Sequence, residues 1–225
     1  ALPLYLGMVP EDQKEKTINY LIDSVVKNHD YHVDTGILGT RYLFEVLSML
    51  GFEEIAYKTA AQKTYPSFGY MIQEGATTIW ERWEKLTGGA MNSHNHIMFG
   101  SIDAWFYKRI AGINCLTPGW ELIGINPNFV EDLKFCTAVV NTVKGSVECS
   151  WERSDKIIKL NIKIPVGSEA EVSFPATKDS VVKINNFDVF KRKFIDNRVC
   201  GFLSSDENSV KLSVGSGQYE LIITK

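Results

Sequence analysis

Apolar residues in the first half of the chain recur at intervals of three and four positions, which is the spacing of a helix with one face in a core. Glycine or proline follows the later stretches, as at Gly51, Pro66 and Gly112, where a helix would end. We therefore expect a helical first half with glycine-rich connections. The expected helices begin after Pro10 and then cover residues 36–50, 53–63 and about 101–110.

From Pro118 onward the apolar period changes to two. Val147, Cys149 and Trp151 alternate with polar residues, so these three side chains should point inward from a half-buried strand. Lys144-Gly145 separates two such runs, as a hairpin turn would. Many short strands with turns between them indicate an antiparallel β-sandwich. The expected strands cover residues 147–151, 158–164, 170–174, 181–184, 210–214 and 219–224.

The change of period places a domain boundary. Pro118 and Pro127 interrupt regular structure between the two halves. We expect residues 1–118 to form the end of a helical domain and residues 119–225 to form the β-sandwich domain. The fold class is therefore multidomain, with α and β parts in succession.

Charge and composition exclude several function classes. The 24 Lys and Arg against 27 Asp and Glu give a formal net charge of -3, which leaves no basic field for nucleic acid. No apolar stretch approaches the roughly 20 residues that cross a bilayer, so we expect neither a nucleic-acid partner nor a membrane. The cysteines show no C-x-x-C spacing and suggest neither a zinc ribbon nor a redox site, and their disulfide state stays open. They are Cys115, Cys136, Cys149 and Cys200.

Three connections of the helical half are dense in residues that bind sugars. They are residues 29–36, 73–84 and 88–96, and they combine carboxylate, imidazole, amide and tryptophan side chains. Tryptophan faces stack on the C–H surface of a sugar ring, while Asn, His and carboxylates bind its hydroxyl groups. A carboxylate held among such groups is able to take a proton from water during attack at the anomeric carbon. Composition therefore suggests a sugar site.

Each candidate also has a structural interpretation. Trp80 and Trp83 could be core residues at the start of a helix. Glu81 could form an ion pair with its neighbour Arg82. Asp103 is explained as a negative charge in a first helical turn.

The histidines allow a third kind of site. His94 and His96 could bind zinc together with Asp34 or Glu81, although H-x-H alone is a weak signal for a metal. We therefore expect no metal and no cofactor. Two more histidines fit a helix C-terminus or a loop better than catalysis, namely His29 and His32.

Several motifs, taken in order along the chain, resemble those of the family 78 glycoside hydrolases, the α-L-rhamnosidases. They lie at residues 33–40, 76–83, 89–96, 99–101, 110–113 and 118–120. The resemblance implies part of an (α/α) six-hairpin toroid followed by an antiparallel β-sandwich. It also implies a bacterial enzyme that removes terminal α-L-rhamnose with inversion at the anomeric carbon.

The resemblance assigns roles to residues of the second and third connections. Glu81 matches the general base of the family, and His96 matches a histidine that contacts the sugar. The implied substrates are rhamnose-containing glycosides or plant polysaccharides. The remaining substrate-binding candidates are placed by their neighbourhood in the motifs, and they are Trp80, Trp83, Asn95 and Asp34.

The general acid of the inverting mechanism has no match. Inversion needs a second carboxyl group roughly 6.5–9.5 Å from the first. In the family it lies upstream of this region, and nothing in the 225 residues resembles that stretch. The local candidates are Glu74, Asp34 and Glu84, none of them in a matching motif.

The number of helices leads to the same expectation. A closed toroid needs roughly a dozen helices and the helical half offers about five, which would leave apolar faces uncovered. The chain also starts at Ala1 without a Met or a visible signal peptide. We therefore expect a missing N-terminal portion to be the partner of this chain, and the chain alone to be inactive. Periplasmic, secreted and cytoplasmic locations all stay open.

Two other functions compete with this hypothesis. One is another (α/α)-toroid carbohydrate enzyme, such as a different glycosidase, a phosphorylase or a polysaccharide lyase that uses Tyr31, His32 and Arg41. The other is a non-catalytic carbohydrate-binding module, which exposed aromatic residues along one strand face would favour. The inward position expected for Trp151 argues against the module, and the ordered motifs argue against the other enzymes.

Overall fold

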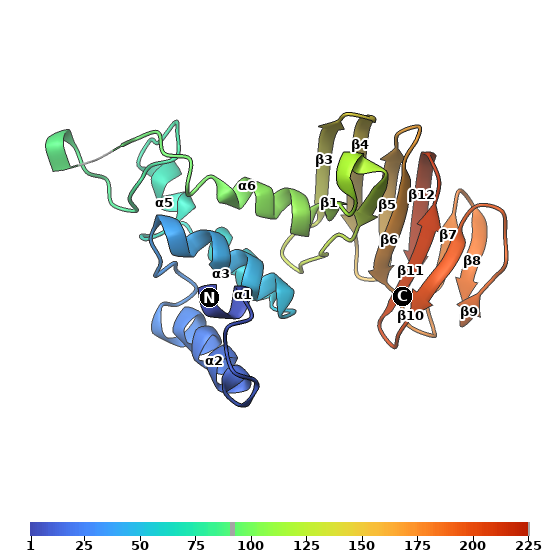
Figure 1. Cartoon of the computed structure of the whole chain (residues 1–225), viewed down its shortest axis with the longest axis horizontal. Helices are drawn as coiled ribbons and strands as arrows, with labels where there is room; N and C mark the ends of the chain where they lie inside the picture. Colours follow the sequence, from blue (N-terminus) through green and yellow to red (C-terminus); the bar gives the residue numbers. More distant parts are fainter. Residues whose placement is uncertain (91–92, 225) are drawn as a thin grey trace. The chain divides into compact units, whose positions relative to one another are not determined.

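The computed structural model describes residues 1–90 and 93–224 and divides the chain into two compact units, Ala1–Trp105 and Phe106–Lys225. The first is helical and the second consists mainly of strands (Figure 1). The domain boundary expected between residues 118 and 119 lies within the second unit and stays a prediction.

Short helices form the first unit. No helix in the described ranges is long and apolar enough to cross a membrane. The helices predicted at 36–50 and 53–63 are present and slightly shorter. In chain order the elements are α1 (Leu2–Tyr5), α2 (Glu11–Asp23), the π-helical η1 (Ser24–Asn28), α3 (Ile37–Met49), α4 (Glu53–Ala60), α5 (Phe68–Gln73), the 3₁₀ turn η2 (Gly88–Ala90) and α6 (Ser101–Trp105).

Helix α5 was not predicted, because six residues are too few to show a helical period. Its start is fixed by Ser67, whose hydroxyl oxygen accepts a hydrogen bond of 2.9 Å from the Tyr70 amide. This is an N-cap, and it satisfies one of the amide groups that the first helical turn leaves without a partner. The short helix carries Phe68, whose ring packs against that of Trp83.

The core of the first unit is built around α3. This helix contacts α1, α4 and α6, and it buries Leu43, Phe44 and Leu47. The Phe44 ring lies 5.5 Å from the Trp105 ring, and the Trp105 indole N–H donates to the Ser48 hydroxyl over 2.8 Å. Most of the apolar stripe read from the sequence is thus the buried face of this helix, but Leu38, at its start, is 68% exposed.

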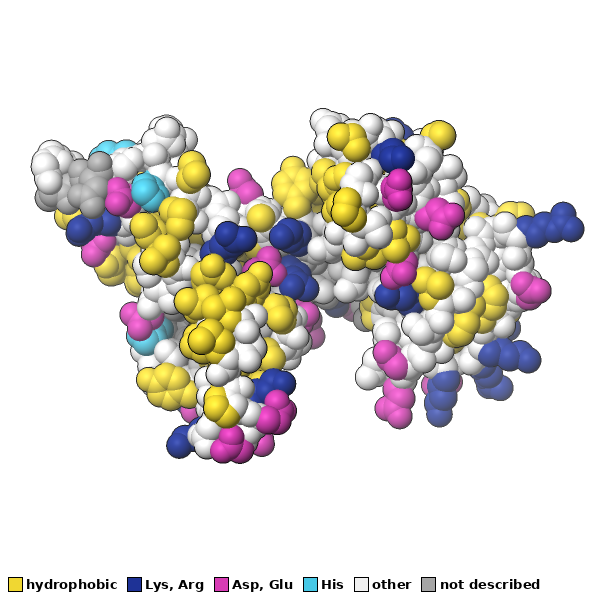
Figure 2. All heavy atoms as spheres, in the orientation of Figure 1, with side chains coloured by type: hydrophobic (Ala, Val, Ile, Leu, Met, Phe, Trp, Pro, Cys, Tyr) yellow, Lys and Arg dark blue, Asp and Glu magenta, His cyan; other side chains and the backbone are white. Residues whose placement is uncertain are grey.

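Other apolar side chains of the first unit stay exposed. Figure 2 shows hydrophobic side chains gathered on the visible face over α1. Burying such surface is favourable by roughly 25 cal/mol per Å², so a soluble protein seldom leaves this much of it uncovered. The exposed large apolar residues of this unit include Leu2, Tyr5, Leu6, Met8, Tyr20, Leu38, Met49 and Ile72.

The second unit begins with the π-helical η3 (Phe106–Ile110) and also holds the 3₁₀ turn η4 (Pro118–Trp120). Its strands form two sheets (Figure 1). The five-stranded sheet has the order β1 (Ile113–Cys115), β2 (Leu122–Ile125), β6 (Glu169–Pro175), β11 (Ser209–Val214), β10 (Gly201–Ser205). The seven-stranded sheet has the order β3 (Phe135–Thr142), β4 (Gly145–Arg153), β5 (Ile157–Ile164), β12 (Gly217–Thr224), β7 (Val181–Ile184), β8 (Phe187–Lys191), β9 (Lys193–Phe194).

The predicted sandwich is confirmed. Buried and less buried residues alternate along β5, β6 and β11, as a strand with one face in a core requires. The hairpin predicted at Lys144-Gly145 joins β3 to β4. Trp151 points inward as expected, with 1% of its surface exposed. Among the residues that the structure describes, all strand pairs are antiparallel except β2 with β6, whose parallel pairing the sequence pattern did not predict.

The four cysteines are free thiols. Cys149 and Cys200 are buried, and Cys115 is exposed. Burial raises the pKa of Cys149 and of Cys136, because a thiolate is poorly solvated inside the sandwich. The second unit is therefore held together by its apolar core and not by disulfides.

Gly112, at the end of η3, should not tolerate a side chain. Its φ is +78°, and an added Cβ would collide with the backbone of Asn126 and Pro127. We expect Gly112→Ala to lower the free energy of unfolding by more than the roughly 1–3 kcal/mol of the left-handed conformation alone. Gly119→Ala is the matched control, because Gly119 has a φ of +74° and open space around it. Urea unfolding of both variants measures the difference between their free energies of unfolding. Equal losses of stability would show that the backbone around Gly112 shifts to make room for the added Cβ.

Candidate functional site

Two of the sugar-binding connections run side by side in the first unit. The His96 amide donates to the Ile79 carbonyl over 2.8 Å, and the Glu81 amide donates to the Ser93 carbonyl over 3.0 Å. The Thr78 hydroxyl adds a short bond to a carbonyl of the same segment. This antiparallel backbone pairing brings together two motifs that are separated in the sequence, although neither is part of a sheet.

Two tryptophans anchor the loop on either side of Glu81. Trp83 stacks on Phe99 at 4.0 Å, and its indole N–H donates to the Thr35 carbonyl over 2.7 Å. Phe68 of α5 packs edge-on against the same indole. Trp80 is 5% exposed and Trp83 is 8% exposed, which leaves little ring surface for a sugar. The geometry favours the core interpretation for both, and sugar stacking on them stays a prediction.

The Glu81 carboxylate faces the His96 imidazole. Glu81 Oε2 lies 3.8 Å from His96 Nδ1, and the side chains are 20% and 29% exposed. This distance exceeds that of a hydrogen bond, so the contact is electrostatic and strengthens when the imidazole is protonated. A half-buried carboxylate on a fixed backbone, open to solvent on one side, has the properties of a proton acceptor.

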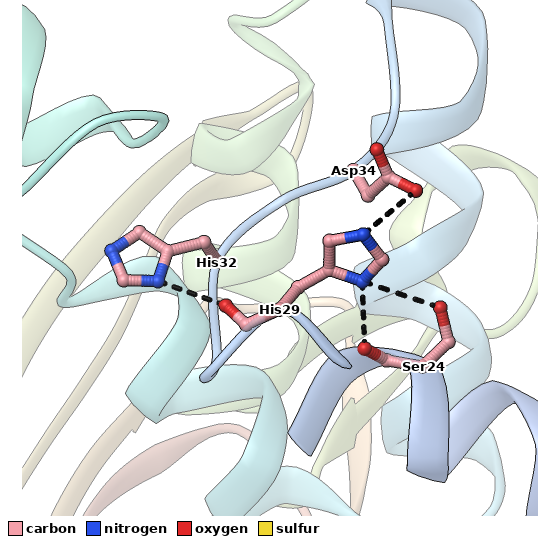
Figure 3. Close-up of polar contacts among 4 residues, drawn as sticks. All are labelled: Ser24, His29, His32 and Asp34. Carbon is pink, nitrogen blue, oxygen red and sulfur yellow. Dashed lines mark hydrogen bonds and ion pairs between the residues drawn. The ribbon is translucent and has the colours of Figure 1, made fainter. Parts of the chain in front are cut away.

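Asp34 lies in a different polar cluster, drawn in Figure 3. Its carboxylate is 3.1 Å from His29 Nε2, and its side chain is 69% exposed. His29 Nδ1 is 2.8 Å from the Ser24 carbonyl, so that nitrogen must donate a proton. The Ser24 hydroxyl, 3.5 Å from the same nitrogen, therefore has no base to activate it, and the cluster is not a nucleophilic triad.

The same cluster confirms the structural interpretation of two histidines. His29 is the C-cap of η1, a helix C-terminal position as the sequence suggested, and its ring contacts the carbonyl of Ser24, the first residue of that helix. His32 Nδ1 contacts the backbone carbonyls of His29 and Asp30, and its Nε2 contacts the Thr64 hydroxyl. Both rings thus hold the loop that leads to Asp34. What the sequence did not reveal is the His29–Asp34 contact, since an exposed loop has no period that would pair them.

The remaining predicted residues are exposed positions of the connection at residues 88–96. Asn95 is exposed, and its backbone amide donates to the Ser93 hydroxyl. His94 Nε2 contacts the Leu86 carbonyl, and its ring lies 5.4 Å from that of Trp80. Two residues of the matching motif, Met91 and Asn92, lie outside the described residues. Within the described part of the chain, no group of three or more His, Cys, Asp or Glu side chains is arranged to hold a metal.

The local alternatives for a general acid are engaged elsewhere. Glu74 forms an ion pair of 3.0 Å with Lys85, and Asp34 contacts His29. Glu84 lies beside Tyr65, where partial burial and then the Glu84 charge raise the pKa of the tyrosine.

Family models match the chain in two successive segments. Residues 1–110 match the bacterial α-L-rhamnosidase six-hairpin glycosidase domain, and residues 112–186 match the bacterial α-L-rhamnosidase C-terminal domain. The chain belongs to the bacterial α-L-rhamnosidase family. The predicted resemblance is therefore confirmed, and the helical unit of this chain is the end of a six-hairpin domain.

Named relatives agree with this assignment. An α-L-rhamnosidase of Formosa agariphila is 33% identical over 97% of this chain and 24% of that protein. An α-L-rhamnosidase of Streptomyces avermitilis is 34% identical over 78% of this chain and 18% of that protein. The chain thus spans about a quarter or less of the length of these curated relatives.

Solved structures show the same fold. The α-L-rhamnosidase of Dictyoglumus thermophilum is 48% identical to this chain and superposes on all of it with a TM-score of 0.90. The matched region makes up 25% of that protein chain. The Streptomyces avermitilis α-L-rhamnosidase, solved in complex with L-rhamnose, is 29% identical and superposes on 98% of this chain with a TM-score of 0.85. The matched region makes up 21% of that protein chain. Both units are thus parts of larger proteins in these relatives.

Proposed function

We propose that this chain supplies the general base, Glu81, for the inverting hydrolysis of terminal α-L-rhamnosides by a longer enzyme. The supporting observation is the half-buried Glu81 carboxylate beside His96, on a loop anchored by two buried tryptophans. The membership of the family and the L-rhamnose complex of the Streptomyces avermitilis relative support the substrate class. The geometry and the family together favour this function over other toroid enzymes.

In the proposed mechanism Glu81 acts on water. The carboxylate takes a proton from a water molecule while the water oxygen forms a bond to the anomeric carbon of rhamnose. The bond from that carbon to the aglycone oxygen breaks on the opposite face, and the general acid gives that oxygen a proton. The sugar leaves with the β configuration, and the two carboxyl groups have exchanged protonation states.

We propose that the general acid lies in another part of the longer enzyme. The local carboxylates Glu74 and Asp34 are already paired with a cation or a histidine. This chain covers only 24% of the Formosa agariphila relative, and the first unit leaves apolar side chains uncovered. Both observations support a partner that supplies more helices and the acid. Rhamnose release from an aryl α-L-rhamnoside by residues 1–225 alone would contradict this part of the proposal.

We further propose that His96, Asn95 and Asp34 bind hydroxyl groups of the substrate. His96 is 29% exposed at its side chain, Asn95 is exposed, and Asp34 is 69% exposed, so each retains surface for a ligand. Trp80 and Trp83 would then act mainly by holding the loop, because their rings are buried.

Replacing His96 by Asn should weaken catalysis in the longer enzyme. The variant loses the imidazole contact with Glu81 and the proposed contact with the sugar, so we expect kcat/KM to fall about tenfold to a hundredfold. Steady-state hydrolysis of an aryl α-L-rhamnoside measures the change. His94→Asn is the matched control, since His94 is exposed and contacts a backbone carbonyl. An equal loss in both variants would remove the specific role of His96.

A further inference from the structure

A polar hollow of about 420 Å³ lies in the seven-stranded sheet of the second unit. Strands β4, β5 and β12 form its floor, and the turn between β7 and β8 forms one wall. Its volume falls within the range of roughly 300–1,000 Å³ of small-molecule sites. The side chains that line it include Glu148, Ser150, Asn161, Lys163, Gln218 and Glu220.

The strand register aligns these six side chains in two rows. In the first row Lys163 of β5 pairs with Glu148 of β4 and with Gln218 of β12. In the second row the central residue is Asn161, between Ser150 and Glu220. Partners in register on neighbouring strands point to the same face of a sheet, so the rows form one continuous polar floor.

The turn beside this floor is fixed to β12. The Asn185 amide donates to the Glu220 carbonyl over 2.9 Å, and the Asn185 side-chain oxygen accepts from the Glu220 amide over 2.9 Å. The Asn185 side-chain amide also contacts the Gln218 carbonyl at 3.3 Å. Three hydrogen bonds to one strand make this wall rigid, so the hollow is preformed.

The charges of the hollow are balanced. Lys163 lies 2.7 Å from Glu148, and Lys159 lies 2.6 Å from Glu220 at the end of the second row. Each cation therefore has its own carboxylate, which leaves no excess charge to hold an anion or a metal. A neutral ligand with several hydroxyl groups matches such a surface, because a hydroxyl donates to a carboxylate and accepts from a lysine.

The centre of the floor has free hydrogen-bonding capacity. Among the residues that the structure describes, the side chains of Ser150, Asn161 and Gln218 have no hydrogen-bond partner, although both ion pairs flank them. Two amides and one hydroxyl offer donors and acceptors at a spacing set by the strands. No tryptophan lines the hollow, so binding should be weak, with a Kd of about 1 mM.

We propose that this hollow binds a neutral saccharide unit, as a second sugar site apart from the Glu81 loop. This goes beyond the proposed function, because its residues belong to the β-sandwich and take no part in hydrolysis. The proposed site also differs from the non-catalytic carbohydrate-binding module considered among the competing functions. Exposed aromatic residues along one strand face would have indicated that module, whereas the floor of this hollow is polar and Trp151 is buried. The chemistry of the floor selects neutral sugars over uronates.

The test is a nitrogen-15 NMR titration of the whole 225-residue chain with L-rhamnose, D-galactose, D-glucose and D-galacturonate in turn. We expect at least one of the three neutral sugars to shift the side-chain amide signals of Asn161 and Gln218, with saturation below about 100 mM. Absence of shifts with all three neutral sugars would overturn the proposal. Shifts with D-galacturonate alone would also overturn it.

Variants localise the effect. Asn161→Val keeps a strand-forming residue but removes the central amide, and Glu220→Gln removes one carboxylate, so each should raise the Kd about threefold to tenfold as read from Gln218. Glu171→Gln is the matched control, because it breaks a comparable ion pair with Lys211 in the other sheet. Sugar shifts that persist unchanged in both hollow variants would overturn the site. Dispersed spectra confirm that each variant is folded. The titration measures sugar binding alone, so its outcome does not depend on whether Glu81 is the base of hydrolysis.

Discussion

Replacing Glu81 by Gln in the longer enzyme should lower kcat for an aryl α-L-rhamnoside by about 10²–10⁴-fold. The amide has nearly the shape of the carboxylate but cannot accept a proton from water, so the loss falls on the chemical step and not on binding. Glu81 Oε2 lies 3.8 Å from His96 in a half-buried position, and the amide keeps that packing. Steady-state kinetics should therefore show a large fall in kcat with a small change in KM.

Asp103→Asn is the matched control for this experiment. It makes the same carboxylate-to-amide change in the first turn of α6, at an exposed position of the same unit. We expect turnover near that of the unmodified enzyme, since the change removes only a favourable charge at a helix start. Unimpaired turnover in the Glu81 variant would exclude Glu81 from the mechanism.

The second large effect concerns the β-sandwich. Trp151→Ala should lower the free energy of unfolding by about 3–5 kcal/mol, because it leaves a cavity in a core where the indole is 1% exposed. The change also removes the 3.0 Å hydrogen bond from the indole N–H to the Ile110 carbonyl. Urea unfolding of the chain, followed by circular dichroism of the strands, measures the loss.

Two further variants separate the causes. Trp151→Phe keeps an aromatic ring and removes the N–H donor, so we expect a smaller loss of about 1–3 kcal/mol. Phe135→Ala on the neighbouring strand removes a ring that is 66% exposed, and the change should stay within about 0.5 kcal/mol. A loss of less than about 1 kcal/mol in Trp151→Ala would mean that the sandwich core does not depend on this indole.

The longer helices and strands could be predicted from the sequence, because packing against a core imposes a period on their apolar residues. Leu43 and Leu47, one turn apart, lie on the buried face of α3, and Val147 and Trp151 share the buried face of β4. These periods follow directly from helix and strand geometry. Short elements without a full period, such as α5 and β10, escaped prediction for the same reason.

Only part of the candidate site could be predicted from the sequence. The resemblance to the family singled out Glu81 and His96, whereas the pairing of their two segments needs backbone hydrogen bonds that no period encodes. The burial of Trp83 depends on Phe99 and on the Thr35 carbonyl, which are contacts between distant segments. Likewise Asp34 meets His29 only because η1 ends where it does.

The polar hollow of the sandwich illustrates the same limit. Asn161 looks like an ordinary exposed position of an alternating strand. Its place between Ser150 and Glu220 depends on the register of three strands, and β12 comes more than fifty residues later in the sequence. Alternation predicts which residues face out, but it does not predict which of them meet.

Glu81→Ala with added azide gives the most direct test of the proposed base. Azide is an anion that attacks the anomeric carbon without losing a proton, so it needs no general base, and the shorter side chain leaves room for it. Proton NMR of the longer enzyme acting on an aryl α-L-rhamnoside should show slow cleavage without azide, and faster cleavage with azide that yields the β-L-rhamnosyl azide. Undiminished rhamnose release without azide, or an azide product of α configuration, would contradict the assignment of Glu81 as the base of an inverting reaction.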